Sequence, residues 1–371
     1  MLRRVLTLNF LDSFVFGVTT LAIPLLMLER GIDLASIGIV FSLAPIAKLL
    51  VRLSSAALAD AAGERWFYLL NGLANFSQSV AYIVSSSPFG FALGKAVDGA
   101  RESFIWAVNR SSIMHQAPER AHFATASMVS GRALYFAFGS LSVGLLFNLG
   151  GYSSALVLCA AIGMAMAALS LQVKNTPHRE KPSLSDFSLL GRGRRFYETA
   201  GALAVGSSFY MVIIYFLMPV FFKLSGFGEW EIGLIYAAYF LVFGSVMNFL
   251  SHHKVSSRTS AAVGALLFMV PLVGMAFLGN AFAPFLFLLM AVGDAHLGIN
   301  WEEIIYLQAS GAKKRSTEVA LLHVPSSFAV FFLSAVSGFV ASAYGFAPLF
   351  LFGAASLALF ALWSVRLSGM K

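Results

Sequence analysis

The chain has 371 residues, of which 58% are hydrophobic and only 11% are charged, and its mean hydropathy is +0.80. Soluble domains carry about 25% charged residues, so this composition excludes a soluble globular protein and indicates an integral membrane protein. The formal net charge of +8 does not predict a nucleic-acid partner. Most basic residues fall in polar segments on one side of the predicted bundle, which is the positive-inside pattern of membrane proteins.

Twelve apolar segments are long enough to cross the hydrocarbon core of a bilayer, which takes about twenty residues. A backbone in lipid must satisfy its own hydrogen bonds, so we predict that these segments are helices. The first run is too long for the h-region of a signal peptide and contains Asp12, so we predict that it is an uncleaved span. The predicted spans cover roughly residues 5–28, 34–58, 66–86, 89–112, 121–147, 153–172, 197–221, 231–251, 259–278, 284–309, 317–342 and 346–366.

One connection differs from the short loops elsewhere. Residues 174–195 are polar, basic and contain proline, which is typical of a linker. The linker divides the chain into a predicted N-terminal bundle, residues 1–173, and a predicted C-terminal bundle, residues 196–371, of six helices each. Within it, Leu184 to Leu190 forms either a short interfacial helix or part of an irregular loop. The charge pattern predicts a multi-pass protein of the plasma or inner membrane with both termini in the cytoplasm.

The two predicted bundles repeat in sequence at one offset of 195 positions. Apolar sequences often match by chance, but shared Pro, Gly and Trp at a single offset indicate a duplication. The matching pairs are Pro24 and Pro219, Gly31 and Gly226, Ile37-Gly38 and Ile232-Gly233, Ala96-Val97 and Ala291-Val292, Trp106 and Trp301, and Arg120 and Arg315. A duplicated six-helix unit is typical of secondary transporters, whose binding site lies near the midplane between the repeats.

The end of the second predicted span, residues 56–65, resembles the loop signature of the major facilitator superfamily. Asp60, Gly63 and Arg65 stand at the matching positions, although Ala56 replaces the first glycine of the signature. The resemblance implies the twelve-helix fold of that superfamily, transport by alternating access and a gating role for these three residues. The motifs are short and place the chain in the superfamily without assigning a subfamily.

The fourth predicted span also resembles that superfamily. It carries Lys95 where the pattern has arginine, followed by Asp98-Gly99. In the family this helix lines the central cavity, so the resemblance implies that its polar face is directed towards the substrate. Spacings of three and four residues put Lys95, Asp98 and Glu102 on one helix face. The alternative is a salt-bridge ladder within the helix that neutralises itself.

Basic residues lie deep inside the predicted N-terminal spans. With about 1.5 Å of rise per residue, Arg52 lies about 12 Å and Lys48 about 18 Å from Asp60 at the predicted surface. A cation at that depth needs water, a partner or a ligand, and an ion pair that locks two helices is the structural alternative. The predicted N-terminal spans contain five basic and three acidic residues, and this surplus of positive charge favours an anionic ligand. The cations are Lys48, Arg52, Lys95, Arg101 and Arg132, and the anions are Asp12, Asp98 and Glu102.

The predicted C-terminal bundle has the opposite balance, with acidic residues in its tenth span. Burial at mid-depth disfavours the charged form of Asp294, which suits reversible protonation, and histidine titrates in the same range. We therefore predict proton-coupling roles for Asp294 and His296, with Asp12, Asp98 and Glu102 as rivals. Asn300 joins the five cations as a candidate substrate-binding residue. Glu302 and Glu303 are better explained as interfacial residues that pair with Lys313 or Lys314.

The sequence predicts a secondary active transporter of a small organic solute, which the surplus of cations predicts to be anionic, driven by protons or by sodium. An alternative is proton-driven efflux of lipophilic or cationic compounds, and another is a membrane sensor that does not transport. We expect no enzymatic activity and no cofactor, since the chain has no Walker loop. His252-His253 has no carboxylate or cysteine neighbours in sequence, so we expect no metal site. A monomer suffices for this architecture.

Overall fold

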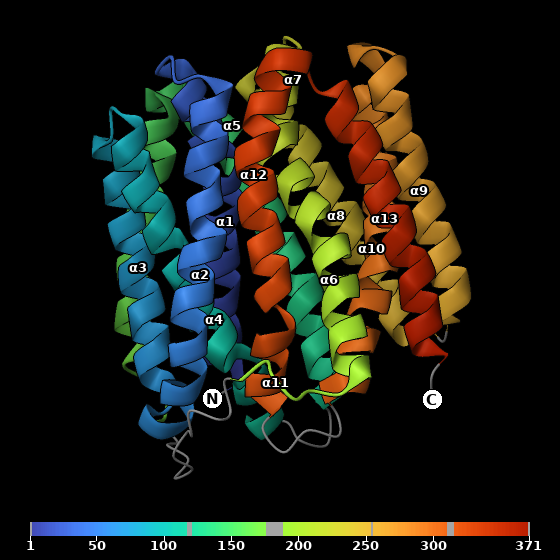
Figure 1. The fold of residues 1–371 in the computed structure, drawn as a ribbon. Coiled ribbons are helices and arrows are strands. Elements are labelled where there is room, and N and C mark those ends of the chain that lie inside the picture. The colour runs from blue at the N-terminus through green and yellow to red at the C-terminus, as the bar shows by residue number, and fades with distance from the viewer. Residues whose placement is uncertain (1, 117–120, 176–187, 254, 310–314, 370–371) are drawn as a thin grey trace.

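The computed structural model of the chain describes residues 2–116, 121–175, 188–253, 255–309 and 315–369. Within these ranges all regular elements are helical, as the sequence predicts. Figure 1 shows them standing side by side in one bundle. We call the end at which the first helix begins and the last one ends the terminal end, and the other the opposite end. Side chains of residues 53, 56–57, 59–61, 110–116, 121–127, 207 and 315–316 are also outside the description.

Five helices form the first group, and their bounds differ from those of the predicted spans by a few residues. They are α1 (Leu2–Glu29), α2 (Leu34–Ala62), α3 (Glu64–Val84), α4 (Pro88–Gln116) and α5 (Ala121–Ser170). Asp33 caps the start of α2, because its carboxylate accepts the N–H and the hydroxyl of Ser36 at 2.9 and 2.7 Å. These hydrogen bonds hold the pKa of Asp33 below its usual value.

A break at Gly150 and Gly151 divides α5 into two segments, as the two predicted spans require. The φ of +65° at Gly151 is a left-handed conformation that favours glycine. The first segment packs on α1, where Gly139 meets the backbone of Phe14, and the second packs on α3, where Gly163 meets Phe76. The glycines allow these helices to approach closely.

The remaining helices form the second group. They are α6 (Arg194–Val212), a π-helical turn η3 (Ile213–Leu217), α7 (Met218–Leu224), α8 (Glu229–His252), α9 (Ser257–Phe277), a 3-10 turn η4 (Asn280–Phe282), α10 (Ala283–Ala309), α11 (Arg315–Leu322), α12 (Val324–Tyr344) and α13 (Ala347–Ser368). α6, η3 and α7 are continuous and together make one predicted span. α11 and α12 make another, interrupted at His323, where Pro325 in the first turn of α12 cannot donate a backbone hydrogen bond.

Nine stretches within the described residues are long and apolar enough to cross a membrane, and one of them contains both segments of α5. α3 and α4 are not among them, although they have 21 and 29 residues. Both carry rows of polar side chains that the bundle buries, including Asn71 and Asn75 on α3 and Asp98 and Arg101 on α4. These polar residues lower the mean hydropathy of both helices. The number of twelve spans stays a prediction.

The two groups contact each other along two seams. Within the first group α1 and α3 pack on α5, and α2 and α3 pack on α4; within the second, α6 packs on α12 and α13, and α10 packs on α8 and α9. Between the groups, α2 packs on α12 and α5 packs on α8. At the α2–α12 seam the backbones nearly touch, since a Cβ on Gly38 would lie 2.7 Å from the carbonyl oxygen of Ser334. The space between the two seams contains the candidate site.

Candidate functional site

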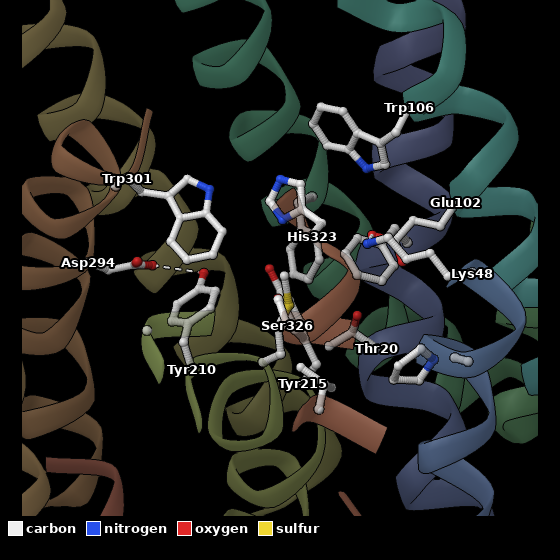
Figure 2. A pocket seen from close by; sticks show the side chains of 18 of the residues that line it. Thr20, Lys48, Glu102, Trp106, Tyr210, Tyr215, Asp294, Trp301, His323 and Ser326 are labelled. Carbon is white, nitrogen blue, oxygen red and sulfur yellow. Dashed lines mark hydrogen bonds and ion pairs between the residues drawn. The ribbon is translucent and has the colours of Figure 1, made fainter. Parts of the chain in front are cut away.

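A cavity of about 400 Å³ lies between the two helix groups. Its lining on α2 runs from Phe41 to Arg52 and on α12 ends at Ser334, so it ends at the seam where Gly38 meets Ser334. On the other side it continues towards the terminal end, to Trp106 on α4 and to Glu302 on α10. The cavity is therefore closed at the opposite end and extends towards the terminal end. Figure 2 shows Lys48 and Asp294 on its two facing walls.

A fully buried charge network stands behind the wall of the first group. Asp12 of α1 accepts Arg101 of α4 at 2.6 Å and Arg132 of α5 at 3.1 Å. Asn71 and Asn75 of α3 donate to the same carboxylate at 3.0 and 3.3 Å. The aspartate is completely inaccessible to solvent. Four helices meet at one carboxylate, so this network fixes their relative positions.

The salt-bridge ladder considered for α4 is present and continues into this network. Lys95 donates to Asp98 at 3.1 Å, and the Nε of Arg101 donates to the other oxygen of Asp98 at 2.9 Å. Lys48 of α2 pairs with Glu102 of α4 at 2.7 Å. Pairing therefore accounts for much of the charge that the sequence left without partners. The count of five cations against three carboxylates is unchanged, so this half keeps a surplus of two formal positive charges.

Exposure separates the basic residues into two sets. Lys48 and Arg132 keep 18% and 12% of their side chains accessible, whereas Lys95 and Arg101 keep 7% and 1%. All four line the cavity, as does Arg52. Lys95 and Arg101 are enclosed by their carboxylate partners and by the rings of Phe41 and Phe16, at 4.3 and 5.2 Å. Lys48, Arg52 and Arg132 are therefore the partly exposed basic residues of this wall, and Lys95 and Arg101 are the buried ones.

The facing wall of the second group carries one buried carboxylate, Asp294 of α10. The hydroxyls of Tyr210 of α6 and Tyr239 of α8 both donate to its Oδ2, at 3.0 and 2.9 Å. Tyr210 lies in the last turn of α6, which leads into the π-helical turn, a local deviation that is frequent at functional sites. The repeat mate of Asp294 is Gly99, whose absent side chain leaves room for the backbone of Ala44 on α2. The equivalent position therefore allows close helix packing in the first repeat and carries a carboxylate in the second.

Two of the predicted site residues on α10 do not line the cavity. The ring of His296 lies 3.0 Å from the hydroxyl of Ser260, and Asn300 donates to the carbonyl of Ser257 at 3.2 Å. Both residues therefore face α9, on the far side of α10. The cavity face of this helix instead carries Asp294, Leu297, Gly298, Trp301 and Glu302. Positions 296 and 300 lie about 200° and 240° around the helix from Asp294, a phase that composition could not establish.

The predicted gating residues lie where α2 meets α3. α2 continues past the predicted end of its span near residue 58 to Ala62, and only Gly63, with φ +88°, separates it from α3. Arg65 lies over the ring of Trp66 at 5.0 Å. The side chain of Asp60 is outside the described residues. α2 and α11 pack against each other near this point.

Several lining residues escaped the sequence-based selection. Trp106 and Trp301 occupy equivalent positions in the two repeats and both line the cavity, on α4 and α10. Arg132 lies over the Trp106 ring at 5.2 Å, and Trp301 contacts His323 at 5.6 Å between ring centroids. The shared offset of 195 pairs the two tryptophans in the sequence, but it does not show that they face the cavity. The position of His323 depends on the break between α11 and α12, for which Pro325 is the one local signal in the sequence.

The comparisons with known proteins agree with this geometry. The family model described as "Major Facilitator Superfamily" matches residues 5–305, so the chain belongs to that superfamily. No sequence among the curated proteins matches the chain.

Two solved structures show the extent of the shared fold. One is a mutant form of the nucleoside transporter NupG, with a TM-score of 0.77, 17% identity and 100% of both chains covered. Another is the human organic anion transporter MFSD10 (TETRAN), with a TM-score of 0.72, 14% identity, and 98% of this chain and 99% of that chain covered. At these identities the likeness shows the fold alone, which is that of a membrane transporter.

Proposed function

We propose that this protein is a secondary active transporter that carries a small organic anion across the membrane by alternating access. The cavity between the two helix groups carries the proposal, because its first wall has a surplus of two formal positive charges. An anion in the cavity would relieve that surplus, and the low dielectric of the surroundings strengthens the attraction. The fold is compatible with this substrate class, since one structural neighbour is an organic anion transporter and another is a nucleoside transporter.

In transport by alternating access, the two helix groups would move relative to each other and open the cavity at one end at a time. Residues 1–173 and 196–371 would move as two bundles about the cavity, joined by the linker of residues 174–195. With the termini in the cytoplasm, the described conformation faces the cytoplasm, since its cavity is closed at the opposite end. Closure on the terminal side would bring α2 and α11 closer together near Asp60 and Gly63. The protein would work in the plasma or inner membrane, and one copy suffices.

Proton coupling is assigned to Asp294. This carboxyl group is buried, lines the cavity and is hydrogen-bonded by two tyrosines. Asp12 and Asp98 are less suitable for reversible protonation, because each is paired with two basic residues that stabilise the ionised form. A ligand or proton moves a two-state equilibrium only if it binds the two states differently. Loss and gain of a proton at the cavity wall supplies that difference.

A second candidate function is export of lipophilic cations. Asp294 would then be the acceptor for the cation, and the aromatic side chains of the second wall would contact the lipophilic part. This function needs no ligand contact with Lys48 or Arg132. It also leaves the positive wall of the first group without a role in recognition.

Counterflow into proteoliposomes tests the proposal and separates the two candidates. The purified protein is reconstituted, loaded with an unlabelled compound and diluted into its labelled form, for a panel of organic acids and of cationic dyes. We expect saturable exchange of at least one acid class and no movement of the dyes. Movement of dyes without acids would support export, and exchange of neither would contradict transport by this cavity.

A further inference from the structure

Asp294 is oriented so that one of its two oxygens is available to the cavity. Both tyrosine hydroxyls donate to Oδ2, and no described residue donates to Oδ1. Asp294 also lines the cavity, and Figure 2 shows it on the wall that faces Lys48. Two hydrogen bonds fix the carboxyl plane, so Oδ1 is a pre-oriented acceptor for a donor group of a solute.

The other pole of the cavity is positive. Lys48 and Arg132 are partly accessible basic residues of the first wall, whereas Lys95 and Arg101 are buried. Each is already oriented by a carboxylate partner, Glu102 or Asp12, that satisfies only part of its donors. The remaining N–H groups are suited to an anionic group. The poles lie on opposite walls, so one solute that contacts both must carry an acid and a donor at separate ends.

Aromatic rings connect the two poles on the side of the closed end. We call Phe16, Phe136, Tyr215 and Phe240 the aromatic floor. The first two residues belong to the first helix group and the last two to the second. Ring centroids lie 5.2 Å apart for Phe16 and Tyr215 and 3.8 Å apart for Phe136 and Phe240. All four line the cavity. A planar ring that rests on this floor gains apolar burial and aromatic contacts.

We propose that the solute is a bipolar aromatic acid. Its anionic group binds between Lys48 and Arg132, its ring lies on the aromatic floor, and a hydroxyl or amine at the far end donates to Oδ1 of Asp294. The cavity of about 400 Å³ falls in the range of about 300–1,000 Å³ typical of small-molecule sites. This inference rests on the proposed function and narrows its substrate class.

The hydrogen-bond donor of the solute should decide which aromatic acids bind tightly. An acid that has no hydrogen-bond donor displaces water from Oδ1 and does not replace the lost hydrogen bond. A buried acceptor without a hydrogen-bond partner weakens binding. Sites built to bind a hydroxyl therefore reject analogues that lack it more strongly than apolar pockets reject a change of size. The tyrosines sharpen this effect, because they hold the carboxylate in place and prevent it from turning away.

Three matched probes test the inference by binding to the purified full-length protein. They are 3-(4-hydroxyphenyl)propanoate, with both poles, 3-phenylpropanoate, with the acid only, and 4-ethylphenol, with the donor only. We expect the bipolar probe to bind about tenfold or more tightly than either other probe, since a hydrogen bond to a charged group contributes about 1.5–3 kcal/mol. Equal affinity for the two acids, or no binding of any probe, would overturn the inference.

Variants of Asp294 test whether its carboxylate causes the preference for the hydroxylated acid. In Asp294→Ala the affinity ratio between the two acids should fall to about one, and in Asp294→Asn, which keeps the shape, to about threefold. The matched control is Glu302→Gln, a second carboxylate of the same helix that lines the cavity, in which the tenfold ratio should persist. Loss of the ratio in the control but not in the Asp294 variants would contradict the assignment.

Counterflow of the two acids separates this inference from the proposed function. A tenfold binding preference without any exchange would refute transport but leave the bipolar site supported. Exchange of 3-phenylpropanoate with an affinity equal to that of its hydroxylated form would support transport and refute the bipolar site.

Discussion

The guanidinium of Arg101 lies 2.6 Å from the carboxylate of Asp12, with both side chains almost fully removed from solvent. Asp12 and Arg101 come from α1 and α4, and the same carboxylate also binds Arg132 of α5. A buried ion pair adds little compared with a well-packed apolar pair, but losing one partner leaves an uncompensated charge. Asp12 and its two arginine partners therefore hold α1, α4 and α5 together at the back of the cavity.

Arg101→Ala should destabilise the protein strongly, because it leaves Asp12 and Asp98 short of a partner. Breaking a buried pair in this way costs about 3–5 kcal/mol. Thermal unfolding of the purified protein in detergent measures the effect, with Lys48→Ala as the control. Lys48 is more accessible, so its loss should lower the melting temperature less. Equal melting temperatures for Arg101→Ala and wild type would show that the network does not stabilise the bundle.

Arg132→Ala should weaken solute binding more than it weakens folding. Arg132 faces the cavity and stacks on Trp106, while Asp12 keeps Arg101 as its remaining partner. Loss of a charge-assisted hydrogen bond of about 1.5–3 kcal/mol should raise the KM for an organic acid by about tenfold or more. The measurement is uptake at varied acid concentration in proteoliposomes. An unchanged KM would remove Arg132 from the binding site.

Part of this site was predictable from spacing and part was not. The i,i+3 separation of Lys95 and Asp98 made a salt-bridge ladder on α4 one of two alternatives, and the structure contains that pair and extends it to Arg101. The partnership of Asp12 with Arg101 spans 89 positions, and no local pattern encodes a contact of that range. The helical fold followed from apolar run length alone, because a backbone in lipid has few alternatives.

The sequence-based prediction of the site failed mainly over which face of each helix is turned towards the cavity. Asp294 and His296 are two positions apart, yet one lines the cavity and the other contacts Ser260 on α9. The hydropathy of α10 is high on all sides, so the sequence carries little information on which face is inward. Nothing in the local sequence marks Tyr210 and Tyr239 as site residues, because their role depends on Asp294 lying between them.

Tyr152→Phe should shift the protein away from the described conformation. At the opposite end, the Tyr152 hydroxyl in the second segment of α5 donates to Glu229 of α8 at 3.1 Å, and Lys223 binds the same oxygen. This link joins the two helix groups only while that end is closed. A net loss of about 1 kcal/mol would change the ratio of the two conformations about fivefold.

A thiol placed in the cavity reports this shift. In a Cys159→Ser background, Thr20→Cys should react faster with a membrane-impermeant reagent added at the opposite end once Tyr152→Phe is introduced. Tyr344→Phe, an exposed tyrosine at the end of α12, is the control and should leave the rate unchanged. Identical rates with and without the Tyr152 hydroxyl would show that the link does not hold that end closed.

Asp294→Asn should separate exchange from proton-driven accumulation. The amide cannot carry the coupling proton, so a pH gradient should no longer concentrate the solute, while exchange of labelled for unlabelled solute should continue. The measurement is accumulation in proteoliposomes with an imposed pH gradient, alongside counterflow. Wild-type accumulation in this variant would assign coupling to another residue or to sodium.

Saturable counterflow of a labelled aromatic acid, measured with the cavity open and with it blocked, tests the account most directly. Ser326 of α12 is directed into the cavity, so Ser326→Trp should fill it, while Leu362→Trp, at a position 73% exposed on the outside of α13, adds similar bulk elsewhere. We predict exchange by wild type and by Leu362→Trp and none by Ser326→Trp. Equal exchange by all three proteins would contradict transport through this cavity.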